Sequence, residues 1–160
     1  MIRIGIGYDV HRLIPGDRCI LGGVAIPYDR SPEGYSDADV LLHAICDALL
    51  GASGEGDLGR YFPSGDPKWK GISSLRLLER TAILLVEKGF HVINIDTVVI
   101  AEGPKIAPHA DAMKKNISHA LSIDPEVVNI KATTNEKIGF IGRGEGIAAQ
   151  AVCLIEGMRV

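Results

Sequence analysis

The sequence predicts an α+β fold, in which one mixed β-sheet carries helices packed on one face, within a single domain that spans residues 1–160. Stretches with the two-residue period of strands and stretches with the 3.6-residue period of helices both occur. They do not follow the strict strand–helix alternation of a parallel α/β sheet. With 46% hydrophobic and 23% charged residues, the chain has the composition of a globular protein and enough length for one hydrophobic core.

The first element is a strand at residues 3–10. Its apolar residues alternate with others, so that Ile4, Ile6, Tyr8 and Val10 share one face. This pattern is typical of a half-buried strand.

A second short strand is predicted at residues 19–26. Gly22 and Gly23 interrupt it, which indicates a bulge or a tight bend. The polar residues 27–34 that follow are typical of a turn-rich connection.

The first helix is expected to begin after Ser36, which can cap it, and Asp39 completes a pattern similar to a capping box. Apolar residues continue at helical spacing to Leu50, and Gly51 is expected to end the helix. Residues 51–71 are rich in glycine and long for a loop, which favours a functional role.

The second half of the chain alternates between both kinds of element. A helix capped by Ser73 or Ser74 is predicted to run to Lys88, with Gly89 at its end. The elements predicted after it are a strand at 91–101, a helix at 108–121, a strand at 127–133, a glycine-rich loop at 139–146 and a closing strand at 147–155.

Composition narrows the class of protein. The net charge of −3 gives no general reason to bind nucleic acid or an anionic membrane. The chain shows no signal peptide, and its longest uncharged apolar stretch is far shorter than the roughly 18–20 residues of a membrane span. Cys19, Cys46 and Cys153 lie in apolar segments without metal-binding spacing. We therefore expect reduced core thiols in a cytoplasmic protein.

The sharpest local feature is Asp9-Val10-His11, because residues two apart on a strand point the same way. On the first helix, Asp39, His43 and Asp47 lie one turn apart on one side. Asp9, His11 and His43 would give three ligands and an open fourth position, which is typical of a catalytic zinc site. Asp47 could then orient His43. The alternative is that His43 is a satisfied polar residue on a buried helix.

Two later segments favour phosphate chemistry. Thr133 and Thr134 could donate to phosphate oxygens, and Glu136 could hold a hard cation such as magnesium. Arg143 and Glu145 stand in a loop of glycines. The alternatives are that the threonines are ordinary strand residues and that Arg143 and Glu145 form a solvated surface pair. With the metal ligands, these features indicate metal-assisted phosphoryl transfer.

Taken together, these motifs resemble the 2-C-methyl-D-erythritol 2,4-cyclodiphosphate synthase family of the non-mevalonate isoprenoid pathway. The matching segments run almost from end to end of the chain, in the order of the family. They are residues 7–11 (GYDVH), 22–28 (GGVAIPY), 36–44 (SDADVLLHA), 47–52 (DALLGA), 56–59 (GDLG), 62–63 (FP), 66–71 (DPKWKG), 104–109 (PKIAPH), 129–137 (NIKATTNEK) and 142–146 (GRGEG).

The resemblance implies a homotrimer with active sites between subunits. The substrate would be 4-diphosphocytidyl-2-C-methyl-D-erythritol 2-phosphate, and the products the cyclic diphosphate and CMP. Asp9, His11 and His43 would bind Zn²⁺, and Glu136 would bind a second divalent ion, Mg²⁺ or Mn²⁺. An isoprenoid diphosphate can occupy the central cavity of such trimers.

The resemblance also implies roles for individual residues. Thr134 and Tyr35 match positions that stabilise the transition state. Positions that contact the substrate are matched by Ser36, Asp57, Leu58, Gly59, Phe62, Ser64, Asp66, Ala101, Pro104, Lys105, Ile106, Ala107, Ala132, Thr133, Phe140 and Arg143. Of these, Phe140 and Arg143 also match the lining of the central cavity.

The chain departs from the family pattern at a few positions. Tyr35 stands where the family usually has histidine, and Ser64 stands where an aspartate that binds the diol is common. A tyrosine donates one hydrogen bond but carries no positive charge, so we expect slower cyclisation. The departures leave open a module that binds a cytidine nucleotide or an isoprenoid diphosphate without catalysis. A zinc phosphohydrolase would share the ligands, but the sequence shows no evident base to activate water.

Overall fold

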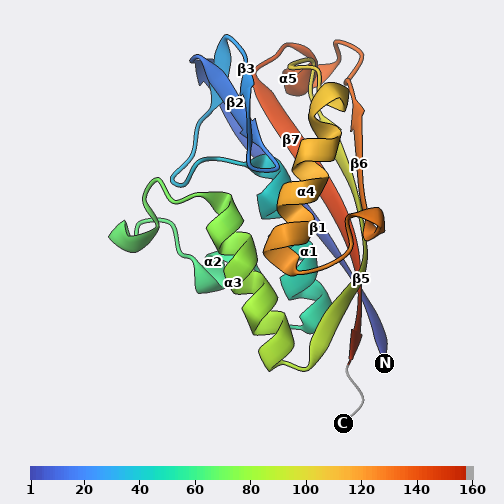
Figure 1. Ribbon diagram of the computed structural model, residues 1–160. Helices are drawn as coiled ribbons and strands as arrows, with labels where there is room; N and C mark the ends of the chain where they lie inside the picture. The colour runs from blue at the N-terminus through green and yellow to red at the C-terminus, as the bar shows by residue number, and fades with distance from the viewer. Residues whose placement is uncertain (158–160) are drawn as a thin grey trace.

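The structure, a computed structural model, describes residues 1–157, and its centre is a mixed five-stranded sheet (Figure 1). The strand order is β4-β1-β7-β5-β6, with parallel pairing only between β5 and β6 among the described strands. Its strands are β1 (Ile2–Pro15), β4 (Arg30–Pro32), β5 (Phe90–Ile100), β6 (Val128–Thr133) and β7 (Gly146–Gly157). The predicted α+β class with a mixed sheet is confirmed.

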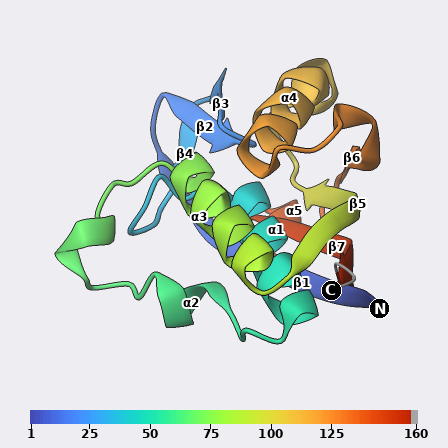
Figure 2. The ribbon, with the colours of Figure 1, turned by 60° about the horizontal axis from the view of Figure 1, so that its bottom comes forward.

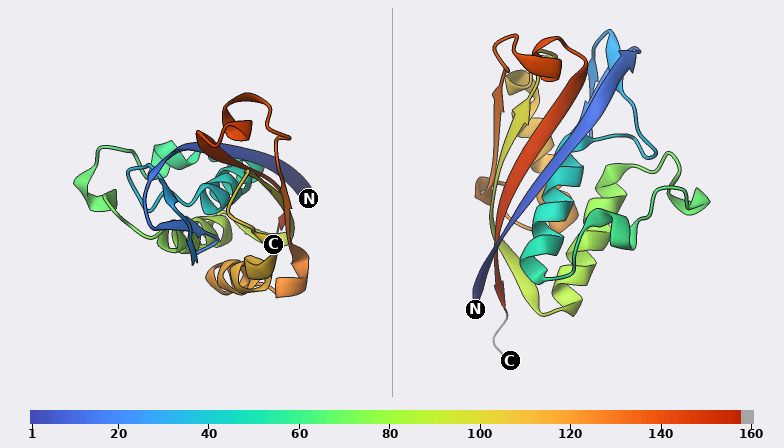
Figure 3. Two further views of the ribbon diagram at one scale, coloured as in Figure 1. Left: turned by 90° about the horizontal axis from the view of Figure 1, so that it is seen from above. Right: turned by 180° about the vertical axis from the view of Figure 1, so that it is seen from behind.

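Three long helices, α1 (Val40–Ser53), α3 (Ser74–Glu87) and α4 (Ala110–Leu121), cover one face of this sheet. Helix α1 lies directly on β1 and β7, α3 packs outside it, and α4 packs on α3 and β6 (Figure 2). Seen from behind, β1 and β7 are nearest the viewer, and none of the three long helices crosses in front of them (Figure 3). The predicted one-sided packing is therefore confirmed.

Helix α1 forms the centre of the core because it is enclosed by the sheet on one side and by α3 on the other. Its buried residues include Leu41, Leu42, Ile45 and Leu49, which are all fully buried. Burying apolar side chains of this size stabilises the fold by about 1.5–3 kcal/mol each. The position of α1 fixes every residue that it carries toward β1, including His43.

The start of α1 differs from the prediction. Asp39, not Ser36, is the N-cap, and its carboxylate accepts a hydrogen bond from the Leu42 N–H at 3.1 Å. The same carboxylate accepts the N–H groups of Gly22 and Gly23. Asp39 is fully buried, and its carboxylate links the Gly22-Gly23 turn to the start of α1. It does not share a metal-binding face with His43.

The end of α1 also differs. The helix continues through Gly51 and ends at Gly54, whose φ of 82° lies in the left-handed region that terminates helices. Gly51 is exposed and has ample space around it, and the buried residues Ala52 and Ser53 carry the helix past it. Packing therefore outweighs the unfavourable helix propensity of Gly51.

Several connections contain more structure than predicted. The glycine pair Gly22-Gly23 turns a hairpin, so the single strand expected there is two, β2 (Arg18–Leu21) and β3 (Val24–Pro27). The turn-rich segment 27–34 contributes β4 to the sheet edge. The two glycine-rich loops and the connections near α4 contain short helical turns, namely α2 (Leu58–Tyr61), η1 (Pro67–Trp69), η2 (Ala107–His109), η3 (Pro125–Val127) and α5 (Gly139–Gly142).

The apolar face of β1 is the exposed one. Ile4 and Ile6 are 69% and 64% exposed, and Tyr8 and Val10 lie on the same side. Gly5, Gly7, Asp9 and His11 face α1 instead. Because Gly5 and Gly7 have no Cβ, α1 can lie close to the N-terminal half of β1. Among the described residues, no helix covers the apolar face (Figure 3).

Two further expectations concern cysteines and membrane spans. All three cysteines are buried and free, as predicted, and burial raises the pKa of the Cys46 thiol to about 12. None of the described helices combines the length and hydrophobicity that a membrane span requires.

Candidate metal centre

Asp9, His11 and His43 converge at the edge where β1 passes the first turn of α1. The Asp9 Oδ2 atom lies 2.9 Å from both His11 Nε2 and His43 Nδ1. The two imidazole nitrogens are 3.2 Å apart. All three side chains are at least partly buried, and they are the one group of potential metal ligands found among the described residues. The predicted triad is therefore brought together.

This donor set fits zinc. Oxygen and nitrogen ligands on a tetrahedral zinc ion lie about 3.3 Å from one another, close to the three observed separations. One carboxylate and two imidazoles are ligands that zinc prefers, and three of them leave one coordination position for a substrate. His11 Nδ1 lies 2.7 Å from the Glu33 carbonyl oxygen and would donate its proton there. That bond leaves the Nε2 lone pair of His11 directed toward Asp9 and His43.

Asp9 and His11 shift each other's pKa, and His43 adds to the shift of Asp9. Burial disfavours the charged form of Asp9, but hydrogen bonds and charge from His11 and His43 outweigh it and lower its pKa to about 2. Burial lowers the pKa of His11, but the adjacent Asp9 raises it by more, so the net shift of this pKa is upward. Asp9 is thus an ionised ligand across the physiological pH range.

The hydrogen-bond partners of His43 Nε2 differ from the prediction. His43 Nε2 lies 2.9 Å from Ser74 Oγ and 3.1 Å from Ser36 Oγ. Asp47, expected to orient His43, instead accepts the N–H of Leu58 at 2.7 Å and so positions the start of α2. Ser74 was recognisable in the sequence only as a helix cap, because its contact with His43 joins residues 31 positions apart.

A pocket of about 200 Å³ opens beside the metal ligands. It gathers five of the predicted substrate or catalytic positions, namely Tyr35, Ser36, Leu58, Phe62 and Ser64. Trp69, Ile72 and Leu77 also line it, and the sequence reasoning missed these three. Their signal is weak, because single apolar residues in a loop or helix are usually ordinary core residues.

The other predicted residues of this loop have structural contacts. Asp57 caps α2 by accepting the Arg60 N–H at 3.0 Å, and Asp66 caps η1 by accepting the Lys68 N–H at 3.0 Å. Neither Asp57, Gly59 nor Asp66 lines the pocket in this chain.

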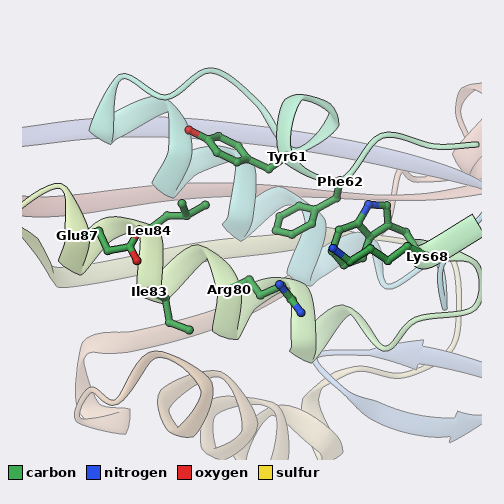
Figure 4. A pocket seen from close by; sticks show the side chains of 8 residues that line it. Tyr61, Phe62, Lys68, Arg80, Ile83, Leu84 and Glu87 are labelled. Atoms are coloured by element: carbon green, nitrogen blue, oxygen red, sulfur yellow. The ribbon is translucent and has the colours of Figure 1, made fainter. Parts of the chain in front are cut away.

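Phe62 and Trp69 line both this pocket and a second hollow of about 290 Å³, which lies between the loop and α3 (Figure 4). Their rings meet edge to face with centroids 5.1 Å apart. The Lys68 ammonium lies 4.5 Å from the centre of the Trp69 ring and covers it from outside. The packed aromatic pair therefore forms a shared wall of the two hollows.

The remaining predicted residues lie elsewhere in the sheet. The pairing register places Asp9 in one row with Ala149, Val99 and Ala132. Three strand spacings of about 4.8 Å put Ala132 about 14 Å from Asp9. Residues 101–107 and 132–136 meet at this far edge, where Glu102 accepts the N–H groups of Asn135 and Lys137. None of them lines the pocket beside the metal ligands.

Phe140 and Arg143 lie around α5, just before the start of β7, and Phe140 lines a hollow together with His11. Phe140 is 44% exposed and packs beside Gly146. Arg143 pairs with Glu145 at 2.7 Å, with both side chains exposed, so the solvated pair considered from the sequence is what the structure shows. Within one chain, the predicted residues of segments 101–107 and 132–136 therefore stand apart from the triad, whereas Phe140 lies near His11.

Known proteins resemble this chain over nearly its whole length. The profile of the YgbB family matches residues 2–156. The 2-C-methyl-D-erythritol 2,4-cyclodiphosphate synthase of Dehalococcoides mccartyi is 59% identical over 97% of this chain and 99% of its own. The bifunctional IspDF of Campylobacter jejuni superimposes with a TM-score of 0.95 at 41% identity, over 99% of this chain and 43% of that one. IspF of Plasmodium falciparum, solved as a CDP complex, gives a TM-score of 0.87 at 35% identity over 99% and 97% of the two chains.

Proposed function

Because the chain belongs to the YgbB family, we propose that it is a 2-C-methyl-D-erythritol 2,4-cyclodiphosphate synthase, a lyase of the non-mevalonate pathway that releases CMP. Its substrate is 4-diphosphocytidyl-2-C-methyl-D-erythritol 2-phosphate. The observation that carries the proposal is the Asp9, His11 and His43 triad opening on a pocket, in a chain 59% identical to a synthase of this name.

Asp9, His11 and His43 would hold Zn²⁺, since their number, type and spacing suit it. Glu136 would hold the second divalent ion, Mg²⁺ or Mn²⁺. When bound, these ions would neutralise the diphosphate and act as Lewis acids on its phosphorus–oxygen bonds.

The reaction itself needs little covalent chemistry from the protein. An oxygen of the 2-phosphate bonds to the β-phosphorus, and the bond from that phosphorus to the bridging oxygen of CMP breaks. The attacking phosphate is already an anion, so no strong base is required. The chain therefore acts by positioning and by hydrogen bonding to developing charge.

The pocket residues divide this task. The hydroxyls of Tyr35 and Ser36 border the pocket beside the ligands and would donate to phosphate oxygens. Residues 57–66 would hold the methylerythritol part, with Phe62 as a fixed wall. Thr134 would stabilise the transition state, and Ala132, Thr133 and residues 101–107 would bind the cytidine, consistent with the CDP held by the relative from Plasmodium falciparum.

Two features of the chain support a homotrimer with active sites between subunits. The cytidine-side segment lies too far from Asp9 to complete the same pocket, so a neighbouring subunit would supply it. The uncovered sheet face carries Ile4, Ile6 and Tyr8, a contiguous apolar surface of the kind that marks an interface. In such a trimer, Phe140 and Arg143 would line a central cavity able to hold an isoprenoid diphosphate.

Phosphorus NMR of the products tests the activity. Zinc-loaded protein should convert the diphosphocytidyl substrate to the cyclic diphosphate and CMP, and His43→Ala should abolish turnover. His119→Ala, on the exposed end of α4, is the matched control and should turn over normally. Free inorganic phosphate would indicate a phosphohydrolase, and nucleotide binding without product would indicate a binding module. A solution mass near three times 17.1 kDa tests the trimer.

A further inference from the structure

His43 carries a hydrogen-bond chain on the side opposite its proposed zinc-binding atom. Nδ1 faces Asp9 and His11, whereas Nε2 faces Ser74 Oγ at 2.9 Å. A neutral imidazole holds one proton, and a nitrogen that binds a metal must keep its lone pair free. The proton must therefore sit on Nε2, where it needs an acceptor.

Ser74 is suited to be that acceptor. Its hydroxyl hydrogen-bonds the Asp37 carboxylate, and its backbone N–H donates to the other Asp37 oxygen at 2.9 Å. A hydroxyl has one proton and two lone pairs, so donation to Asp37 leaves lone pairs for His43. Ser74 is fully buried, which excludes water as a competing partner.

Asp37 is itself held in place. It accepts the Asp39 N–H at 3.2 Å, and its own N–H donates to the Ile72 carbonyl at 3.1 Å. Its carboxylate stands at the N-terminus of α3, where Ser73 makes no side-chain capping bond, so Asp37 caps that helix from another segment. The positive end of the helix dipole favours a carboxylate there.

Ser36 differs from Ser74 although both hydroxyls approach His43 Nε2. Ser36 Oγ lies 3.1 Å from that atom and borders the substrate pocket. Its nearest other partner is the Ala38 N–H, which occupies a lone pair and leaves the hydroxyl proton free for a phosphate oxygen. Ser74 has no such freedom because its proton is committed to Asp37.

We propose that Ser74 and Asp37 are positioning residues that hold His43 in the Nε2–H tautomer and so set the zinc affinity of the site. The proposal rests on the zinc site of the proposed function. Removing an outer partner of a metal-binding histidine typically weakens metal affinity about 10–100-fold.

The proposed role of Ser74 and Asp37 is tested by the zinc affinity of the purified full-length protein, measured by competition with a chromophoric chelator. Ser74→Ala should weaken zinc binding about 10–100-fold, and Asp37→Asn should act in the same direction. Ser118→Ala is the matched control, because Ser118 is a buried helix serine whose hydroxyl donates to the Lys115 carbonyl within α4, and the variant should bind zinc like the wild type. Thermal melts of each metal-free variant establish that it is folded.

Nitrogen-15 NMR of the zinc-loaded wild type gives a readout independent of any substitution. The spectrum should show His43 protonated at Nε2 and unprotonated at Nδ1. Ser74→Ala should also regain turnover in excess zinc, whereas His43→Ala should not. The proposal would be overturned if folded Ser74→Ala bound zinc within twofold of the wild-type affinity, or if His43 of the wild type were protonated at Nδ1. Neither measurement of affinity nor NMR needs the substrate, so a failure of the proposed activity would be seen separately.

Discussion

Gly7 of β1 lies directly against the backbone of Ala44 in α1. A Cβ on Gly7 would stand 1.9 Å from the Ala44 carbonyl oxygen, a distance that no side chain can occupy. Ala44 follows His43 in sequence, and Gly7 precedes Asp9 by two residues on the same strand face. The contact therefore fixes the distance between the two elements that supply the potential metal ligands.

Gly7→Ala should destabilise the protein and weaken zinc binding together. The added methyl group must push α1 away from β1, and such overpacking costs about 1–3 kcal/mol. The same displacement moves His43 from Asp9 and His11. Urea denaturation and zinc competition on one preparation measure both effects.

Gly51→Ala is the matched control for this substitution. Gly51 lies inside α1, and a Cβ added there would have the Ile6 carbonyl oxygen, at 4.0 Å, as its nearest neighbour. Alanine in a helix interior is about 0.5–1 kcal/mol more stable than glycine, so the variant should gain stability and keep its zinc affinity. A Gly7→Ala protein as stable as the wild type would contradict the close packing.

Tyr35→His should accelerate cyclisation. Tyr35 borders the pocket, and its carbonyl oxygen accepts the Gly71 N–H at 2.9 Å, so the backbone holds the side chain in place. A charged imidazolium donates a hydrogen bond about 1–1.5 kcal/mol stronger than a neutral hydroxyl, equivalent to about tenfold in rate. Single-turnover kinetics measure the change. Tyr35→Phe, which loses the donor, should slow the reaction, and a Tyr35→His enzyme no faster than the wild type would show that this position does not contact developing charge.

Asp39→Ala should cost about 2–4 kcal/mol of unfolding free energy. The substitution removes the cap of α1 and leaves the N–H groups of Gly22 and Gly23 without their buried acceptor. Asp124→Ala provides the control, because Asp124 caps η3 in an exposed position by one bond to the Glu126 N–H. It should cost less than about 1 kcal/mol in the same denaturation experiment. Equal losses would show that the link between the hairpin and α1 adds nothing to the cap.

Zinc affinity should fall as the pH is lowered from 8 to 5.5. In the metal-free protein, burial lowers the pKa of His11 but Asp9 raises it more, so the net pKa lies above its ordinary value of 6.5. Zinc must displace that proton below this pKa, which weakens binding by about tenfold for each pH unit and each proton. Asp9, with a pKa of about 2, is already ionised and contributes no proton in this range. A flat affinity profile in chelator competition would contradict zinc binding through His11.

The sequence alone determined the class of fold and the cluster of potential metal ligands. Helical and strand periods are local properties, and they placed the strand at 91–101 and the helix at 108–121 within two residues of β5 and α4. Asp9 and His11 were predictable as a pair because alternate strand residues must share a face. The family resemblance supplied the substrate, since no pattern in the residues specifies it.

Only the tertiary structure decided which surfaces and partners these residues have. The sequence of β1 alternates between an apolar face and a face that carries Gly5 and Gly7. Helix α1 packs on the glycine face, because its backbone lies so close to β1 that a Cβ would not fit. His43 is oriented by Ser74 rather than by Asp47, since the relevant contact comes from another helix and not from the next turn. Ala132 lies about 14 Å from Asp9 because strand order separates them. Each of these outcomes depends on which distant segments meet, and local periodicity carries no information about that.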